Sequence, residues 1–562
     1  MGGSLEADRR SYNELKELAL AALEAGEDER CLDLCRAAAA LASRVHIGIW
    51  YDTGLEEILR SVGRRVAGTR ARVSAAVGAT AGSPPGAPTA DGRKRVAHIT
   101  SFLSDMGGHS RTIRQMVLLL EELGVRQTIF VTNLSSEPVP HPHFERGLSG
   151  RAVDIIELLP DETYYSRVGA LQEHIEQEGY ELAILFVSGD DVIAFSALAG
   201  LEKRPPTLYF NHNDMDFWLG KMVTDRLIDA RTVGARYSRV HRGIESSFIL
   251  PVTSDFRKGP RNRGAIGIPE DATLSVSLGS FYKTMGDPGL DYFRAVGRVL
   301  ERFPNHYHMF LTGPPPPDID KRVAALPFRP EVKRRLIVYG PEPEPLKVYS
   351  SADFLIETFP CVGGMVRVEA MAVGLPILGF KNKRFPLLSE TDNFPPDYPL
   401  IASSGSEVEE LSSRLIQDPM LRERVGRQLR EYFEKKFAPE VLLPGLRAFL
   451  DALLAREEQP ESAVSSPSGS PDARLQDGSE AAYDVEYAHD WRYRDLWPWR
   501  FLLLQAVTKR GDFSLRDRAR FYSMALKKGE FAGALDRAAY LGIALGGRLG
   551  FLALSRFRSA LT

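Results

Sequence analysis

The segment from Glu357 to Phe380 constrains the fold of this chain more than any other part of the sequence. It reads ETFPCVGGMVRVEAMAVGLPILGF, which predicts a short buried strand, a glycine turn, a helix and a second buried strand. Strands joined through helices form parallel sheets, and ligands bind such sheets at the carboxyl ends of the strands. A helix that begins after paired glycines offers unpaired N–H groups and a favourable dipole to an anion. The segment therefore predicts a diphosphate site at the start of its helix.

Glu369 lies in the same predicted helix, about one and a half turns after its start. Its carboxylate is able to reach back past the phosphates, and a carboxylate accepts hydrogen bonds from the vicinal diol of a sugar. The alternative is a carboxylate on a solvated helix face. The neighbours of Glu369 are apolar, however: Val366, Val368, Ala370, Met371 and Val373. Because an unpaired glutamate is rarely buried, this packed face favours a binding role for Glu369.

Size and composition limit the kind of protein. A chain of 562 residues is too long for one hydrophobic core, and its length predicts about three to four domains. The net charge of -3 argues against general nucleic-acid binding, so we expect no nucleic-acid partner. The cysteines, Cys31, Cys35 and Cys361, are too few for a disulfide framework and indicate a reducing compartment. Because the first residues lack an apolar run before a cleavage site, we expect a cytoplasmic protein.

Strands and helices alternate along the middle of the chain. Apolar runs occur at 95–102, 127–134, 181–189, 206–213 and 248–255, and again at 272–281, 307–313, 335–340, 354–359 and 376–380. The runs are continuous, and helical patterns separate them, which is typical of a parallel sheet covered on both faces. We therefore predict an α/β fold with two Rossmann-like, doubly wound domains, at 94–260 and 261–455, facing a cleft. The helical stretch from 406 to 455 is expected to close the second domain.

Helical segments flank the two predicted domains. Residues 1–67 have helical periodicity and predict a packing or interaction appendage, and the Ala/Gly/Pro-rich residues 68–93 predict a linker. Residues 456–480 predict a Ser/Pro linker, followed by a basic helical segment at 481–562. From Trp491 onward this segment has 14 Lys and Arg against 5 Asp and Glu. Peripheral contact with an anionic membrane and packing against the two domains are equal alternatives for it.

Three further loops place polar residues after predicted strands. The loop SFLSDMGGHSRTI (101–113) has Asp105 and then His109 at a helix start. The loop FNHNDMDFWLG (210–220) ends the fourth apolar run and gathers Asn211, His212, Asp214 and Asp216. The loop SLGSFYKTMGDPG (277–289) carries Lys283 at the end of a buried strand. Strand ends face the predicted cleft, so these residues are candidates for the chemistry.

Residues 95–455 resemble a GT-B glycosyltransferase, in which two Rossmann-like domains hold a nucleotide sugar between them. Within this fold, the motifs at 101–113, 277–289 and 357–376 resemble the O-GlcNAc transferase-like, HMW1C-like group. The family 4-type glycosyltransferases are the second family that these motifs resemble. Their retaining members carry a further glutamate at the position where this chain has Cys361.

The resemblance implies a donor site in the second domain. A lysine there acts as the cation against the diphosphate, backbone amides bind the phosphates, a carboxylate binds the ribose, and a strand end offers backbone groups to the nucleobase. The corresponding donor-binding residues are Lys283, Gly363, Gly364, Met365, Glu369, Val338 and Tyr339. For Lys283 the alternative is a solvated loop lysine.

The same resemblance places the acceptor at the first domain. His109 and His212 are the candidates for the base, because an imidazole that is neutral near pH 7 accepts a proton, and with Lys283 they are the predicted catalytic residues. A helix-capping or surface role is the alternative for His109. The predicted acceptor-side residues are Asp105, Asn211, His212, Asp214 and Asp216. Because lysine, amides and helix dipoles neutralise the diphosphate in this fold, we expect no metal and no cofactor.

The resemblance as a whole implies a bacterial-type glycosyltransferase. It would transfer a hexosyl or N-acetylhexosaminyl group from a nucleoside diphosphate donor, which we expect to be UDP-linked, to an acceptor in protein, glycan or lipid-linked glycan. A nucleotide-sugar epimerase or hydrolase on the same fold is one alternative. A non-catalytic scaffold that binds a nucleotide sugar is the other.

Overall fold

The computed structural model describes residues 5–455, with internal gaps at 78–92, 106, 135–139, 160–161, 286, 288, 314–318, 385–387 and 390–392. Beyond residue 455 it describes only Ala519, Tyr522, Ser523, Leu526 and Leu541. The predicted linker at 456–480 and nearly all of the predicted basic segment at 481–562 therefore lie outside the described residues. None of the described helices combines the length and the apolar character needed to cross a bilayer.

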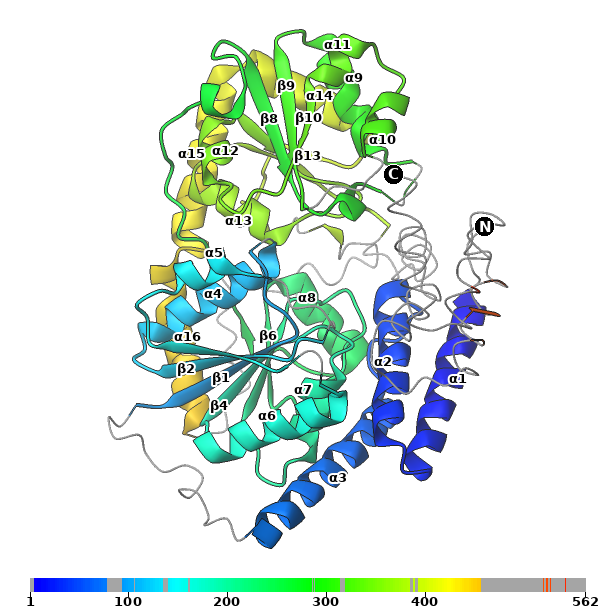
Figure 1. Cartoon of the computed structure of the whole chain (residues 1–562). Coiled ribbons are helices and arrows are strands. Elements are labelled where there is room, and N and C mark those ends of the chain that lie inside the picture. The colour runs from blue at the N-terminus through cyan, green and yellow to red at the C-terminus, as the bar shows by residue number, and fades with distance from the viewer. Residues whose placement is uncertain are drawn as a thin grey trace.

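The first of two parallel sheets has seven strands in the order β3-β2-β1-β4-β5-β6-β7 (Figure 1). Its strands are β1 (Arg95–Thr100), β2 (Arg126–Val131), β3 (Val153–Glu157), β4 (Leu182–Phe186), β5 (Thr207–Asn211), β6 (Arg226–Asp229) and β7 (Phe248–Ile249). The helices of this domain are α4 (Gly108–Glu121), α5 (Pro142–Gly147), α6 (Tyr164–Glu178), α7 (Val192–Gly200) and α8 (Thr232–Tyr237), with the short helices η1 (Lys221–Val223) and η2 (Ser238–Arg242). The strands β1, β4 and β5 are almost entirely buried, as expected for a sheet with helices on both faces.

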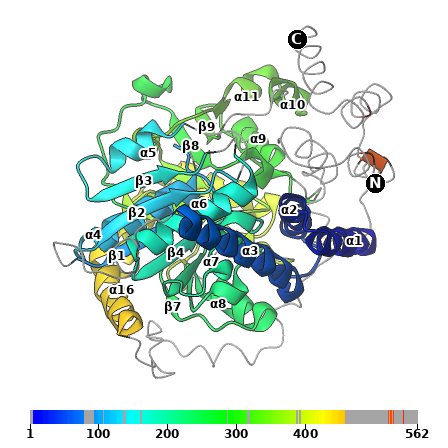
Figure 2. The same cartoon turned by 60° about the horizontal axis from the view of Figure 1, so that its bottom comes forward.

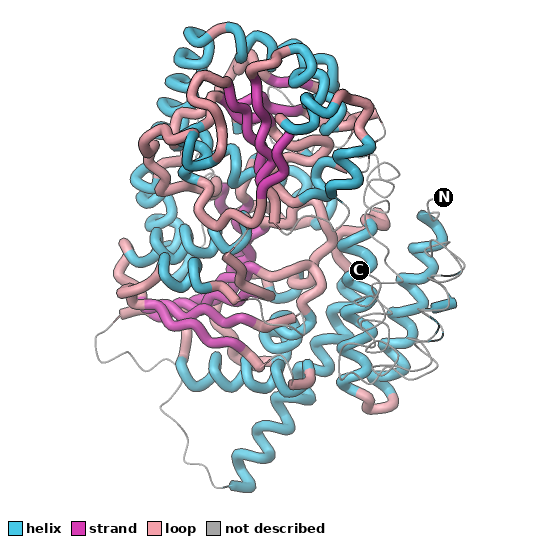
Figure 3. The backbone as a smooth tube through the Cα atoms, turned by 45° about the horizontal axis from the view of Figure 1, so that its top comes forward, coloured by secondary structure: helices cyan, strands magenta, loops and turns pink. Residues whose placement is uncertain are grey.

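The second sheet has six strands in the order β10-β9-β8-β11-β12-β13. Figure 3 draws the strands of both sheets in magenta. Its strands are β8 (Thr273–Leu278), β9 (His306–Leu311), β10 (Leu336–Tyr339), β11 (Phe354–Ile356), β12 (Ile377–Phe380) and β13 (Ile401–Ala402). Its helices are α9 (Tyr292–Arg302), α10 (Ile319–Ala325), α11 (Pro330–Arg334), α12 (Leu346–Ser351), α13 (Gly364–Ala372), α14 (Gly405–Gln417) and α15 (Pro419–Lys436), with η3 (Gly264–Ile266) and η4 (Phe281–Thr284). In both sheets the first strand lies between the second and the fourth, which is the doubly wound order. The prediction of two Rossmann-like domains is confirmed.

The ten predicted apolar runs all contain a strand, but three strands lie outside them. These are β3, β6 and β13. Strand β3 lies at the edge of its sheet and is only partly buried, and β13 has two residues, so neither leaves a continuous apolar run. Strand β6 is a four-residue strand with charged residues at both ends.

The N-terminal helices are part of the first domain rather than an appendage to it. Helices α1 (Leu5–Glu24), α2 (Asp28–Val45) and α3 (Thr53–Val77) share one hydrophobic core with β1, β4 and α7, and α3 lies beside α6 and α7 in Figure 2. A Cβ placed on Gly63 of α3 would lie 2.0 Å from the carbonyl oxygen of Ser196 in α7, so the two helices approach too closely for any side chain there. Because α3 continues to Val77, the predicted linker cannot begin at residue 68.

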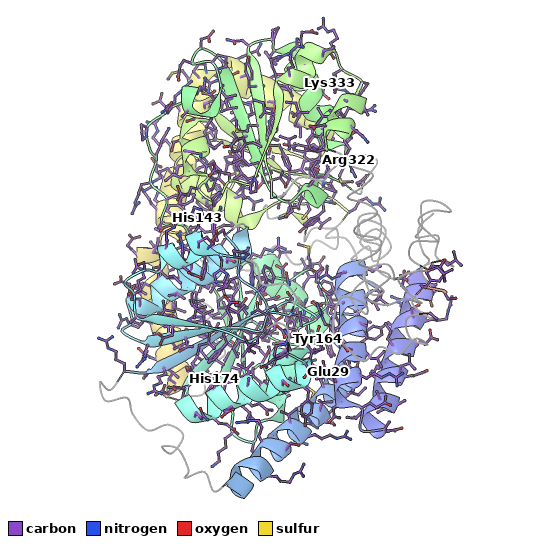
Figure 4. The ribbon with its side chains drawn as sticks, viewed as in Figure 1. Glu29, His143, Tyr164, His174, Arg322 and Lys333 are labelled. Carbon is purple, nitrogen blue, oxygen red and sulfur yellow. The ribbon has the colours of Figure 1, made fainter. Side chains whose placement is uncertain are left out.

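A side chain of α2 also caps a helix of the first domain. The carboxylate of Glu29 accepts hydrogen bonds from the backbone N–H groups of Tyr164 at 2.8 Å and Tyr165 at 2.7 Å. Glu29 and Tyr164 are labelled side by side in Figure 4. A carboxylate at a helix N-terminus satisfies unpaired N–H groups and interacts favourably with the helix dipole.

The last described helix, α16 (Pro439–Leu454), returns from the second domain to the first (Figure 1). Its residues Leu446, Phe449, Leu450 and Leu453 are buried in a core with Val96 and other residues of the first sheet. The Phe449 ring stacks on Phe248 with 5.1 Å between the centroids. The prediction that residues 406–455 close the second domain is therefore correct for α14 and α15 and wrong for α16.

Candidate functional site

The strand order of the second sheet reverses between β8 and β11. In open parallel sheets ligands bind at such a reversal, outside the carboxyl ends of the strands. The loop after β8 leads into η4, which contains Lys283, and the loop after β11 leads to Gly363 and α13. Two of the predicted motifs, distant in sequence, therefore meet at one edge of the sheet.

The N-terminus of α13 has free backbone donors. Its N-cap is Gly363, which provides no side-chain cap. Within the part of the chain that the structure describes, the N–H groups of Gly363, Gly364, Met365 and Val366 donate to no protein group. The start of α13 therefore offers donors to an anion, and the binding of phosphates by Gly363, Gly364 and Met365 stays a prediction.

Lys283 lies against the start of this helix. Its Nζ donates a hydrogen bond to the carbonyl oxygen of Val362 at 3.0 Å, and its own carbonyl oxygen accepts one from the N–H of Cys361 at 3.2 Å. A Cβ placed on Gly363 would lie 3.5 Å from Nζ, which places the ammonium in contact distance of the first residue of the turn into α13. The structure thus brings Lys283 and the α13 amides together.

Glu369 is buried, as its apolar neighbours predicted, but its carboxylate has two partners. Oε1 accepts a hydrogen bond from Arg111 Nη1 at 2.7 Å, and Oε2 accepts one from the hydroxyl of Tyr349 at 2.9 Å. Arg111 belongs to α4 of the first domain, so this contact crosses between the domains. Neither partner was predicted from the sequence, although Arg111 lies two residues after His109 in the motif at 101–113.

Helix α4 faces α13 from the first domain. Its N-cap Gly107 has a φ of 96°, which favours glycine, and it provides no side-chain cap. A Cβ placed on Gly108 would lie 3.2 Å from the Cβ of Met365, so the two glycine-opened helix starts are in contact. The first turns of α4 and α13 therefore lie next to each other where the two domains meet.

His109 lies in the first turn of α4. Its Nε2 is 2.9 Å from the hydroxyl oxygen of Thr100 at the end of β1. Its ring packs against Phe102, with centroids 4.8 Å apart, and against His212, with centroids 4.6 Å apart. Burial, and then the neighbouring His212, hold the pKa of His109 well below its ordinary value. The ring is therefore neutral near pH 7.

His212 follows β5 and has a defined tautomer. Its Nδ1 lies 3.2 Å from the carbonyl oxygen of Phe210. A carbonyl only accepts, so Nδ1 carries the proton and Nε2 keeps its lone pair. Burial lowers the pKa of His212, against the opposing effects of the Phe210 carbonyl and Asp214. Among the described residues Nε2 has no hydrogen-bond partner, which makes His212 the better placed of the two candidate bases.

The other predicted acceptor-side residues have hydrogen-bond partners within the first domain. Asp105 accepts hydrogen bonds from the N–H groups of His143 and Phe144 at 2.8 and 2.9 Å and so caps α5. Asn211 donates to Asp229 at 2.6 Å and to Ser238 at 3.0 Å, in the domain interior.

Asp214 and Asp216 are also part of the interior. The Asp214 carboxylate forms a two-bond ion pair with Arg231, at 2.5 and 2.7 Å, and both side chains are buried. Asp216 is buried, and its carbonyl oxygen accepts a hydrogen bond from Arg242 at 2.5 Å. The contacts of Asp105, Asn211 and Asp214 are structural, and these three side chains are occupied. No group of three or more His, Cys, Asp or Glu within the described residues has a geometry able to hold a metal ion.

Val338 and Tyr339 lie at the edge of the second sheet, in β10. The carbonyl oxygen of Tyr339 accepts a hydrogen bond from the N–H of Thr312, so this group is occupied. In a parallel pair, alternate residues point their backbone groups to the partner strand. The backbone groups of Val338 therefore point to the open edge, where a ligand is able to pair with them.

Comparisons with known proteins support the architecture. No protein-family model matches the chain. The curated UDP-N-acetylglucosamine–peptide N-acetylglucosaminyltransferase of Giardia intestinalis is 26% identical over 122 residues, which is 21% of this chain and only 8% of that protein.

Two solved structures of HepE from Anabaena are similar to the chain. The complex with UDP and glucose has a TM-score of 0.51 at 12% identity and covers 64% of this chain and 100% of its own. The complex with UDP-glucose has a TM-score of 0.50 at 12% identity, with coverages of 64% and 99%. The mutant O-GlcNAc transferase from Thermobaculum terrenum has a TM-score of 0.46 at 12% identity, with coverages of 79% and 84%. With its two doubly wound domains and this similarity to HepE, the chain has the GT-B fold that the sequence resemblance implied.

Proposed function

We propose that the chain is a glycosyltransferase that moves a sugar from a UDP-linked donor to an acceptor hydroxyl or amide. The observation that carries this proposal is the start of α13, where free backbone N–H groups lie beside the ammonium of Lys283 at the strand-order reversal of the second sheet. HepE, which has the same fold, is described in complex with UDP-glucose.

The donor diphosphate binds between α13 and Lys283 in this proposal. The amides of Gly363, Gly364 and Met365 donate to phosphate oxygens, and Lys283 neutralises the charge that develops as the nucleotide leaves. Glu369 binds the ribose, and the open-edge backbone groups of Val338 pair with the nucleobase. Because lysine and amides supply the counter-charge, we propose that transfer continues in the presence of the chelator EDTA.

The acceptor approaches from the first domain, and His212 takes its proton. The ring is neutral at pH 7, the carbonyl of Phe210 holds the proton on Nδ1, and Nε2 is left to accept the acceptor proton. His109 packs against His212, and burial together with His212 lowers the pKa of His109. The transferred group is a hexosyl or N-acetylhexosaminyl group.

A screen of nucleoside diphosphates by thermal shift tests the donor class. A ligand present at one hundred times its dissociation constant stabilises a protein by about 2.7 kcal/mol, which is a readily measured shift in melting temperature. We expect UDP to stabilise the chain more than ADP, GDP or CDP. No shift with any of the four would contradict the proposed donor site.

Product analysis then separates transfer from other chemistry. UDP-glucose and UDP-N-acetylglucosamine are each incubated with the protein, with and without a bacterial extract as the source of acceptors. A transferase consumes the donor only when an acceptor is present. Consumption without acceptor would instead indicate a hydrolase or an epimerase.

A further inference from the structure

An ion pair between the two domains closes off the carboxylate that the proposed function assigns to the ribose. Arg111 Nη1 lies 2.7 Å from Glu369 Oε1, and these residues are 258 positions apart in the sequence. The Glu369 side chain is 2% exposed, and that of Arg111 is 18% exposed. The glutamate is thus covered by its partner, and the arginine keeps access to solvent.

The position of Arg111 is unfavourable without this partner. Arg111 lies in the first turn of α4, where the helix dipole is positive and disfavours a cation. Glu369 compensates for the dipole by an ion pair, so the preferred state of Arg111 depends on a residue of the other domain.

Glu369 has a second partner inside its own domain. The hydroxyl of Tyr349 donates to Oε2 at 2.9 Å, and both residues are buried. Tyr349 therefore stays with Glu369 when the domains separate, whereas Arg111 moves away with α4.

We propose that Arg111 occupies the ribose end of the donor site in the nucleotide-free protein, and that a nucleotide binds only after Arg111 releases Glu369. This inference rests on the proposed function, because it takes Glu369 as the ribose ligand. The ion pair acts as a latch between the domains: the latched protein is closed to the donor, and the ribose hydroxyls replace the guanidinium on Oε1.

The latch has a measurable consequence with a definite sign. A protein that spends most of its time in a state unable to bind shows an apparent dissociation constant raised in proportion. Removing Arg111 removes that state and tightens binding. A residue that itself contacts the nucleotide has the opposite effect, because its removal weakens binding.

Isothermal titration of the full chain with UDP is the test. We expect Arg111→Ala to bind UDP about fivefold more tightly or better than the wild type, as for a latch closed most of the time. The matched control is Arg114→Ala, because Arg114 lies one turn further along α4 and pairs with the exposed Asp255, and it should leave the UDP affinity unchanged. An unchanged or weaker affinity of Arg111→Ala overturns the latch.

Two further variants keep the outcomes distinguishable. In a Glu369→Gln background there is no ion pair to release, so adding Arg111→Ala should give no gain in UDP affinity, and a persisting gain overturns the assignment of Glu369. If Arg111→Ala does not fold, Arg111→Gln replaces it, with the same expected direction. Failure of the proposed function gives a different result. In that case the wild type does not bind UDP, and its titration is the same as that of the Lys283→Ala variant.

Discussion

The carboxyl ends of the two sheets differ in what they leave available to a ligand. In the second domain the α13 amides are free among the described residues, and Lys283 lies beside them. In the first domain the carboxylates of Asp105 and Asp214 are bound to backbone amides and to Arg231. Although both sheets are doubly wound, the second domain offers backbone donors and a cation at its strand ends, and the first domain offers neutral imidazoles.

This difference indicates a division of labour. In the proposed function an anionic diphosphate needs donors and positive charge, and the second domain has both. The acceptor needs a group that takes up a proton, and the proposal assigns this role to His212, which packs against His109. Polar residues that follow a strand therefore do not form a site merely by their place in the sequence, because many of them hold their own domain together.

The largest expected effect is the loss of the base. Replacement of His212 by Asn removes the Nε2 lone pair, and we expect kcat to fall about 10²- to 10⁴-fold, as for general bases elsewhere. The matched control is His174→Asn, because His174 lies on α6 away from the other domain (Figure 4) and should retain activity. Retained activity in His212→Asn would pass the role to His109, to be tested by His109→Asn.

The acid limb of the wild-type pH profile tests the same assignment. Because burial lowers the pKa of His212, the active neutral form should persist below the ordinary histidine value of about 6.5. We therefore expect kcat/KM to decline only at more acidic pH. A limb above pH 6.5 would mean that His212 is not the titrating group.

A test of the structural role of the first-domain carboxylates follows. Asp214→Ala leaves the buried Arg231 without its ion pair, and breaking a buried pair in this way costs roughly 3–5 kcal/mol of stability. Urea unfolding measures this loss, with Asp255→Ala as the exposed control. Full stability together with a raised acceptor KM would instead return Asp214 to the acceptor site.

A smaller effect is expected from the cation of the second domain. Lys283→Ala removes the ammonium beside α13, and we expect turnover to fall about 10²-fold or more, by analogy with the loss of one oxyanion contact. The control is Lys347→Ala, because Lys347 is an exposed lysine of the same domain that pairs with Glu342. Unchanged turnover in Lys283→Ala would exclude Lys283 from the mechanism.

The smallest expected effect is the response of the two sheets to acid. The second sheet buries His306 and His308, and burial lowers the pKa of His308 to about 3. The unfolded chain protonates its histidines near pH 6.5, so the unfolded state binds more protons below that pH, and the free energy of unfolding falls from about pH 6.5 down to about pH 3.

Hydrogen exchange measured between pH 7.5 and pH 5 locates this loss. Strand β1 of the first sheet carries His98, where burial lowers the pKa to about 4, and His109 and His212, whose pKa values are also lowered, follow β1 and β5. Acid therefore acts on both sheets, and the contrast lies within the second sheet. After correction for the intrinsic pH dependence of exchange, we expect protection to drop more in β8 and β9 than in β12, which carries no histidine. Equal loss in β8, β9 and β12 would show that these buried histidines do not dominate the acid response.

Much of the fold was predictable because its signals are local. The central strands are fully covered, so each appears as a continuous apolar run, and Gly363 and Gly364 mark where α13 begins. Edge strand β3 and the two-residue β13 lack such runs and were missed. The return of α16 to the first domain was also missed, because an amphipathic helix shows that it packs without showing against what.

The sequence by itself determined the parallel α/β class and the glycine-opened helix, because periodicity and backbone conformation depend on neighbouring residues. The prediction for Lys283 came instead from the resemblance of its motif to a known family. Only the tertiary structure decided which polar side chains remain available. The partner of Asp214 is Arg231 from another loop, and the partner of Glu369 is Arg111 from the other domain. Hydrogen bonds and ion pairs form between groups close in space, and for these residues the fold sets that closeness.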